Sequence, residues 1–142
     1  GEYLTLGGVK IPFSKALQAH SDGDVLVHSL IDAILGAINA SDIGTHFPDD
    51  DVQYKNANSL DLLQNIYKLM SSKGYFLMNM DATIILEKPK LSKYINKMKE
   101  NIAETLNCST DILSIKATTS EGIGFVGRQE GIACLCSILL DK

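Results

Sequence analysis

The chain has 142 residues, of which 45% are hydrophobic and 21% are charged, and its formal net charge is -4. This length and composition predict a single globular domain over residues 1–142, and the acidic balance argues against a nucleic-acid partner. No apolar run approaches the length of a bilayer span, so we expect no membrane partner, and three cysteines without a disulfide or zinc-ribbon spacing favour a reducing compartment.

The first third of the chain predicts a broken strand, a helix and a loop. Residues 3–12 are β-prone, and a glycine pair interrupts them with a turn or a bulge. A capping-box pattern at Ser21 and Asp24 predicts a helix over residues 22–40. Residues 41–51 are rich in turn formers and acids and predict a loop. The apolar face of the helix is expected to comprise Leu26, Leu30, Ile31, Ile34 and Ala37.

The rest of the chain alternates between helical and strand patterns. We predict, in order, a helix over 59–72, a strand over 76–86, a helix over 92–106, a strand over 112–117, a polar loop over 118–127 and a strand over 131–140. This order predicts an α+β domain in which helices cover one face of a sheet. The apolar alternation of the last strand suggests that the second face is also covered, which a homo-oligomer would achieve.

One helix of the first third carries residues suited to chemistry. Asp24, His28 and Asp32 are four residues apart in succession and therefore lie along one side of that helix. This row of carboxylate, imidazole and carboxylate lies beside His20 and Ser21, and such groups are costly to bury without partners. The spacing alone is equally compatible with a solvated face that carries an ordinary histidine.

A second polar cluster follows a predicted strand. Thr118, Thr119 and Ser120 offer hydroxyls that can hold phosphate oxygens, and the Glu121 carboxylate can share a divalent ion with that phosphate. A serine/threonine turn is the commoner meaning of such a pattern, and the usual nucleotide-binding glycine motifs are absent. Arg128 is the single arginine of the chain, which suggests a position where a bidentate donor is needed.

The candidate residues fall into short segments spread over nearly the whole chain. In chain order these are His20-Ser21-Asp22-Gly23-Asp24 with His28 and Asp32, Asp42-Ile43-Gly44, Phe47-Pro48-Asp49, Pro89-Lys90, Lys116-Ala117-Thr118-Thr119 with Glu121, Gly124-Phe125, Gly127-Arg128 and Glu130-Gly131-Ile132-Ala133. In this order and spacing they resemble the 2-C-methyl-D-erythritol 2,4-cyclodiphosphate synthase family of the non-mevalonate isoprenoid pathway. The run over residues 19–28 is specific to that family.

The resemblance implies an α+β subunit with a mixed β-sheet, assembled as a homotrimer with active sites at subunit boundaries. It implies an enzyme, a phosphorus–oxygen lyase that converts 4-diphosphocytidyl-2-C-methyl-D-erythritol 2-phosphate to the 2,4-cyclodiphosphate and CMP. The reaction is a metal-assisted intramolecular attack of the 2-phosphate on the β-phosphate. The alternative is a non-catalytic trimer of the same fold that binds CDP or isoprenoid diphosphates.

The family's catalytic and metal-binding roles transfer to individual residues. The resemblance makes His20 and Thr119 the stabilisers of the transition state. It makes His28 a ligand of Zn²⁺ or another divalent transition metal, oriented by Asp32, with Asp24 in the same supporting set. Glu121 resembles the ligand of Mg²⁺ or Mn²⁺.

The substrate-binding roles transfer in the same way. Ser21 resembles a phosphate contact, and the ribose, the methylerythritol end, the cytosine and the diphosphate each correspond to a further segment. Those segments are Asp42, Ile43 and Gly44 for the ribose; Phe47, Pro48, Asp49, Asp50 and Asp51 for the cover over the methylerythritol; Leu86, Glu87, Lys88, Pro89, Lys90, Leu91 and Ser92 for the cytosine; and Thr118, Thr119, Ser120 and Glu121 for the diphosphate. Phe125 and Arg128 complete the set, and Arg128 with Glu130 is expected near the trimer axis, where a central cavity can hold an isoprenoid diphosphate.

One family feature is missing from the sequence. The family's zinc site takes two further ligands from an Asp-x-His motif on a strand that precedes residues 4–11, and this chain contains no such pair. Zinc sites need three protein ligands, so His28 alone does not complete one. Either the segment precedes Gly1 or this form is metal-deficient, and the retention of the other site residues favours the first. A bacterial cytoplasm and a plastid-type organelle both fit the sequence, with lysine-rich, arginine-poor usage tilting slightly toward the plastid.

Overall fold

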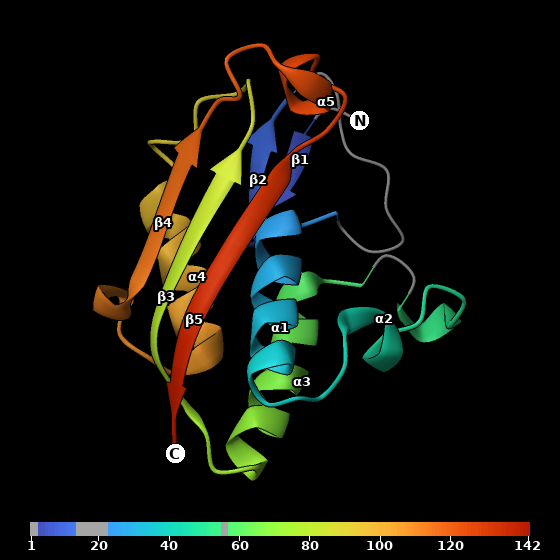
Figure 1. Ribbon diagram of the computed structural model, residues 1–142, viewed down its shortest axis with the longest axis vertical. Coiled ribbons are helices and arrows are strands. Elements are labelled where there is room, and N and C mark those ends of the chain that lie inside the picture. The colour runs from blue at the N-terminus through green and yellow to red at the C-terminus, as the bar shows by residue number, and fades with distance from the viewer. Residues whose placement is uncertain (1–2, 14–22, 55–56) are drawn as a thin grey trace.

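A mixed β-sheet forms one layer of the subunit (Figure 1). The computed structural model describes residues 3–13, 23–54 and 57–142, and among these the main sheet has three strands. The central strand β3 (Phe76–Ile85) pairs in parallel with β4 (Leu113–Thr118) and antiparallel with β5 (Ala133–Asp141). The predicted α+β class with a mixed sheet is therefore confirmed.

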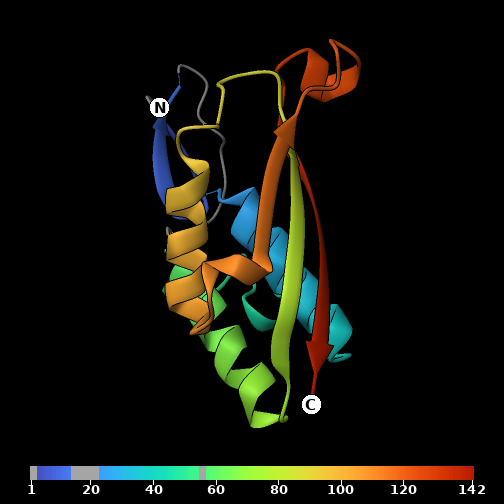
Figure 2. The ribbon, with the colours of Figure 1, turned by 90° about the vertical axis from the view of Figure 1, so that its left-hand side faces the viewer.

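The long helices cover one face of this sheet, as the sequence predicts. Helix α1 (Val25–Ala37) packs against β5, α4 (Ile95–Leu106) packs against β4, and α3 (Ser59–Ser72) lies between these helices. Figure 2 views the sheet edge-on, with α3 and α4 on one side of it and α1 passing behind the strands. The core between the layers is apolar, and its fully buried side chains include Leu26, Leu30, Ile31, Leu63, Ile66, Met80 and Ile84.

A hairpin of β1 (Tyr3–Leu6) and β2 (Val9–Pro12) lies beside the helices and is tied to them by one carboxylate. Its turn is the predicted glycine pair, and both glycines have a positive φ, which suits a two-residue hairpin turn. The Asp24 carboxylate is fully buried and accepts hydrogen bonds from Gly7 N (3.0 Å), Gly8 N (2.8 Å) and Val27 N (3.0 Å). Hairpin and helix therefore share one anchor.

The predicted start of α1 is wrong, and the role of Asp24 explains why. The helix begins at Val25 with Asp24 as its N-cap, not at residue 22, because the Asp24 side chain accepts from Val27 N instead of lying inside the first turn. Ser21, the other half of the predicted capping box, lies outside the described residues. The helix also ends earlier than predicted, at Ala37, which is exposed.

Other boundaries also differ from the sequence prediction. The expected loop over 41–51 contains a short helix, α2 (Ile43–His46), because Asp42 accepts from Thr45 N and caps it, and η1 (Val52–Tyr54) follows. Helix α4 starts at Ile95 instead of 92, because residues 91–94 form a turn closed by Tyr94 N and Leu91 O. Strand β4 follows a single turn, η2 (Thr110–Ile112), and the polar loop after β4 contains α5 (Gly124–Gly127). Helix α3 matches its predicted bounds.

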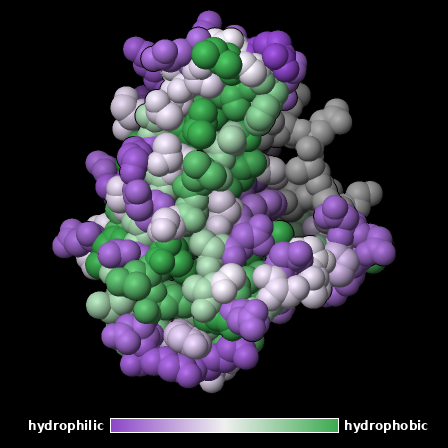
Figure 3. Space-filling view, in the orientation of Figure 1, coloured by the Kyte–Doolittle hydropathy of each residue, from purple (hydrophilic) through white to green (hydrophobic). Residues whose placement is uncertain are grey.

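The second face of the sheet carries exposed apolar side chains. Phe76 and Met78 on β3 are 50% and 42% exposed, and Leu135 and Leu139 on β5 are 68% and 56% exposed. Figure 3 looks onto this face and shows hydrophobic surface running along the strands. Among the described residues, no helix is long and apolar enough to cross a bilayer.

We expect Asp24→Ala to lower the free energy of unfolding by about 3 kcal/mol, since it removes a helix cap and leaves the buried Gly7 N–H and the half-buried Gly8 N–H without their acceptor. Asp24→Asn keeps an oxygen for Gly7 and Val27 but presents an amide to Gly8 N, so its loss should be smaller. Urea unfolding measures both. Glu104→Ala, which removes an exposed carboxylate on α4, serves as the control, and an equal loss in Asp24→Ala and this control would contradict the anchoring role.

Candidate active site

The candidate site lies where β3 and β4 end. Because these strands are parallel, with Ile85 opposite Thr118, the segments that follow them leave the sheet at the same edge, where both strands have their carboxyl ends. The Leu86 N–H continues the pairing beyond β3 by donating to Thr118 O at 2.9 Å. The segment over 86–92 and the loop over 118–122, which are far apart in sequence, therefore begin side by side.

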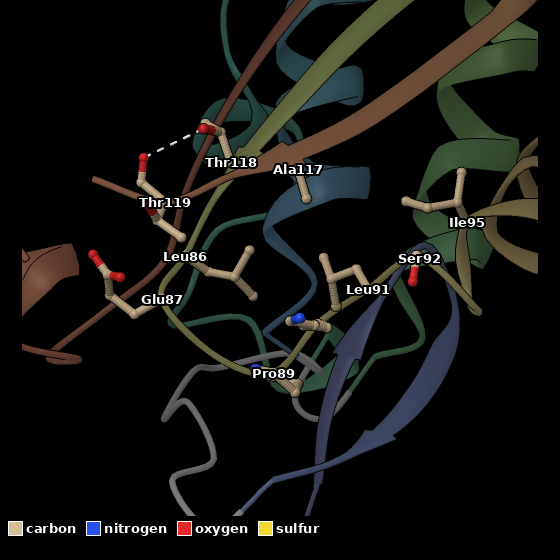
Figure 4. A pocket seen from close by; sticks show the side chains of 10 residues that line it. Leu86, Glu87, Pro89, Leu91, Ser92, Ile95, Ala117, Thr118 and Thr119 are labelled. Carbon is tan, nitrogen blue, oxygen red and sulfur yellow. Dashed lines mark hydrogen bonds between the residues drawn. The ribbon is translucent and has the colours of Figure 1, made fainter. Parts of the chain in front are cut away.

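A pocket of about 330 Å³ opens between these two segments (Figure 4). Leu86 and Leu91 are buried and give it an apolar wall, while Thr118 and Thr119 supply exposed hydroxyls. Its lining consists of Leu86, Glu87, Pro89, Lys90, Leu91, Ser92, Ile95, Ala117, Thr118 and Thr119. An apolar cleft with a few polar groups suits a small ligand that has a flat ring and a charged end.

The sequence prediction and the lining agree for most residues. The structure brings together eight residues predicted to bind substrate, namely Leu86, Glu87, Pro89, Lys90, Leu91, Ser92, Thr118 and Thr119, whereas Lys88 does not line the pocket. Ile95 and Ala117 line it without having been predicted. Ala117 belongs to a segment shared with the family, which was a usable signal, whereas Ile95 shows only a helical apolar pattern in the sequence.

The Glu87 carboxylate holds the loop that follows β4. Its Oε1 accepts from Gly122 N at 2.9 Å and from Ser120 N at 3.3 Å, and Ser120 Oγ lies 3.1 Å away. The Gly122 N–H, together with the Ser120 donors, lowers the pKa of Glu87 below its ordinary value of 4.5. Glu87 is therefore ionised at neutral pH.

This loop presents Thr119 and Glu121 outward. Thr119 Oγ1 accepts from Glu121 N at 3.1 Å, and Glu121 has a φ of 54°, followed by Gly122 at 80°. Both side chains are exposed, and no hydrogen bond from a described residue occupies the Glu121 carboxylate. Beyond the loop, Phe125 is exposed, and Arg128 Nε donates to Glu130 Oε2 at 2.9 Å.

The predicted zinc ligand lies on α1. His28 is half-buried, and its Nε2 is 2.7 Å from Ser59 Oγ at the start of α3. The predicted supporting residue Asp32 accepts from Ile43 N at 2.8 Å and so holds the start of α2. No sequence signal pointed to Ser59, because its contact depends on how α1 and α3 pack. His20 and Ser21 lie outside the described residues.

Within residues 3–13, 23–54 and 57–142, no three His, Cys, Asp or Glu side chains gather as metal ligands would. The donors present fit the two predicted metals to different degrees. The exposed carboxylate of Glu121 suits Mg²⁺ or Mn²⁺, which take few protein ligands. His28 would supply only one of the three protein ligands that the predicted zinc site needs.

The predicted ribose and methylerythritol contacts lie elsewhere in the chain. Asp42 accepts from Thr45 N and Thr45 Oγ1, both at 2.9 Å, and these bonds lower its pKa below 3.8. Phe47 packs edge-on against Tyr54, with ring centroids 5.1 Å apart. Figure 1 places α2 beside the far end of α1, away from the β4–α5 loop. One chain therefore does not bring the α2 segment to the pocket.

Known proteins resemble this chain along nearly its whole length. The YgbB family model matches residues 1–141. A 2-C-methyl-D-erythritol 2,4-cyclodiphosphate synthase of Clostridium kluyveri is 56% identical over 137 residues, which cover 96% of this chain and 84% of that protein. The corresponding synthase of Clostridioides difficile is 51% identical over 141 residues, covering 98% and 88% of the two chains.

Solved structures agree in fold. The bifunctional IspDF of Campylobacter jejuni superposes with a TM-score of 0.93 at 47% identity, covering 98% of this chain and 38% of that one. The CDP complex of IspF from Plasmodium falciparum gives 0.86 at 38% identity, covering 98% and 83%. With the sequence matches, these likenesses settle the family: the chain belongs to the YgbB family of 2-C-methyl-D-erythritol 2,4-cyclodiphosphate synthases, whose reaction yields the cyclic diphosphate and CMP.

Proposed function

We propose that this chain catalyses the family's reaction with cytosine in the pocket between residues 86–92 and the β4–α5 loop. The observation that carries this is the shared edge of β3 and β4, where an apolar cleft adjoins the Thr118 and Thr119 hydroxyls. The substrate is 4-diphosphocytidyl-2-C-methyl-D-erythritol 2-phosphate, and the products are its 2,4-cyclodiphosphate and CMP. A solved relative in complex with CDP supports the choice of ligand.

The chemistry needs positioning more than a strong base. An oxygen of the 2-phosphate is already anionic and forms the new bond to the β-phosphorus. The bond between that phosphorus and the oxygen bridging to the α-phosphate breaks, and CMP leaves with this oxygen. The enzyme must therefore bend the substrate until attacking and leaving oxygens are in line, and neutralise the charge on the phosphates.

The exposed loop after β4 suits that task. The Thr119 hydroxyl, with His20, would donate to phosphate oxygens as charge shifts toward the leaving group. Ser21 and Thr118 would hold the phosphates, and the apolar wall at Leu86 and Leu91 would seat the cytosine. Lys88, Phe125 and Arg128 stay predicted contacts.

The metal sites complete this proposal. Glu121 would hold Mg²⁺ or Mn²⁺, and His28 would be one ligand of Zn²⁺, a site that needs two further protein ligands. Asp32 and Asp24 stay predicted supporting residues. When bound, these ions supply positive charge that stabilises the transition state on the phosphates.

We further propose that the working form is a homotrimer. The second face of the sheet exposes apolar side chains on β3 and β5, and burial of these side chains against another subunit would be favourable. The separation of the α2 segment from the pocket supports a site in which Asp42, Ile43, Gly44 and residues 47–51 of one subunit meet the pocket of its neighbour. Arg128 and Glu130 would lie near the trimer axis and adjoin a cavity for an isoprenoid diphosphate.

The relatives also bear on the compartment. Those described above with more than 50% identity are bacterial, which favours a bacterial cytoplasm over the plastid-type organelle. We propose that setting for this chain.

Turnover is the direct test of the function. Phosphorus NMR of the substrate mixed with the protein and Mg²⁺ should show the cyclic diphosphate and CMP forming in equal amounts. Binding of CDP without any turnover would instead support the non-catalytic alternative.

We expect Glu121→Gln to abolish most metal-dependent turnover, because it keeps the size of the side chain and removes the charge that would hold the cation. Folding should persist, since the carboxylate is exposed and bonded to no described residue. A titration of Mg²⁺ against rate measures the effect, with Glu104→Gln on α4 as the matched control. A near-normal rate with unchanged metal dependence would refute the ligand role.

A site shared between subunits predicts rescue between inactive variants. His28→Ala alters α1, and Thr118→Ala alters the loop after β4. After subunit exchange in an equal mixture, about one quarter of the sites should combine two intact halves and restore about that fraction of the wild-type rate. Thr118→Ala mixed with Thr119→Ala should give no rescue, because both changes affect the same half. Failure of the first mixture after confirmed exchange would place the whole site within one chain.

A further inference from the structure

We propose that Glu87 is a positioning residue, which sets the rate by holding the β4–α5 loop and not by contacting substrate. This inference rests on the proposed function, because it assigns the loop's Thr119 and Glu121 to the reacting phosphates. It differs from the role that the family resemblance suggests for Glu87, which is a contact within the cytosine pocket.

The geometry separates the two ends of this residue. The backbone of Glu87 lies in the segment that lines the pocket, directly after Leu86. Its carboxylate points away from Leu91 and Ser92 in Figure 4, toward the loop. There Oε1 accepts from Gly122 N at 2.9 Å and Ser120 N at 3.3 Å. Glu87 thus joins the pocket wall to the loop across 35 residues of sequence.

The loop needs such an acceptor. Glu121 and Gly122 both have a positive φ, and left-handed backbone at a residue other than glycine is unfavourable unless the surroundings hold it. The two N–H groups that flank Glu121 converge on one oxygen, an arrangement by which turns bind anions. Bonding on both sides of Glu121 fixes the direction of its side chain and that of Thr119, whose Oγ1 accepts from Glu121 N.

We call the bonds from Ser120 N and Gly122 N to the Glu87 carboxylate the Glu87 clamp, and the negative charge of Glu87 strengthens it. The Gly122 N–H, with the Ser120 donors, holds the pKa of Glu87 below 4.5, and hydrogen bonds to an ionised acceptor are stronger than neutral ones. Because the pKa is depressed in the folded protein, the stabilisation is present above 4.5 and is lost as the pH falls through the lowered value.

The first test compares Glu87→Ala with Glu87→Gln. Misplaced reacting groups cost about 10- to 100-fold in rate, so we expect a kcat loss of that order for Glu87→Ala. Its affinity for CMP, which has no β-phosphate, should stay within about threefold of wild type, because the apolar wall is intact. Glutamine keeps an oxygen that accepts both N–H bonds, so Glu87→Gln should keep kcat within about fivefold of wild type. Glu104→Ala on α4 is the matched control and should change neither parameter.

Other roles for Glu87 give other patterns. If the carboxylate were a metal ligand, Glu87→Gln would fail as badly as Glu87→Ala, and the Mg²⁺ requirement would rise. If it contacted cytosine, CMP affinity would fall in the alanine variant. Either pattern, or an unchanged kcat in Glu87→Ala, overturns the proposal.

The Gly122 amide gives a readout that needs no turnover. Its NMR shift in the substrate-free wild-type protein should include a titration with a midpoint below 4.5, and this component should be lost in Glu87→Ala. An identical titration in both proteins overturns the clamp. A wild-type protein that has the titration but no synthase activity would retain the clamp and refute the proposed function, so the two failures are distinguishable.

Discussion

Because β3 and β4 run parallel, the two segments that leave their carboxyl ends must start at the same edge of the sheet. The hydrogen bond from Leu86 N to Thr118 O extends that pairing past the last residue of β3, and the Glu87 carboxylate extends it further into the loop. The pocket and the exposed hydroxyls depend on this arrangement. An antiparallel pairing would send one of the two segments to the opposite end of the sheet.

The two faces of the sheet serve different purposes in this account. The helices bury one face and form the core, with Asp24 joining α1 to the β1–β2 hairpin through three backbone N–H groups. The other face keeps apolar residues exposed on β3 and β5, at a cost that burial against another subunit would offset. The same assembly would bring the α2 segment of one subunit to a neighbour's pocket. Oligomerisation would thus bury the exposed apolar side chains of β3 and β5 and also bring together the two parts of the active site.

Local signals account for what could be predicted from the sequence. The bounds of α3 were predictable because Asn58 caps its start and Gly74 follows its end. The start of α1 was misplaced because Asp24 caps the helix by accepting from Val27 N and also accepts from Gly7 N and Gly8 N. The last two partners lie 16 to 17 residues away, so a helical pattern does not reveal them.

The candidate site, too, was predictable from the sequence only in part. The residues of 86–92 and 118–119 were predictable from the family resemblance, and the structure adds that all of them except Lys88 line one pocket. The positioning role proposed for the Glu87 side chain was not predictable, because in the sequence a charged residue shortly before Pro89 indicates only that a strand ends there. Its partners Ser120 and Gly122 become neighbours only through the parallel pairing. Long-range contacts of this kind depend on topology, which periodicity does not encode.

The most direct measurement of the central claim is the set of backbone amide NMR shifts that change when CDP is added to the protein. If the shared edge of β3 and β4 holds the cytidine diphosphate, the largest changes will fall in residues 86–92 and 117–122, with Leu86, Leu91 and Gly122 among them. Changes confined to α3 and the β1–β2 hairpin, with residues 86–92 unmoved at saturating CDP, would contradict the account.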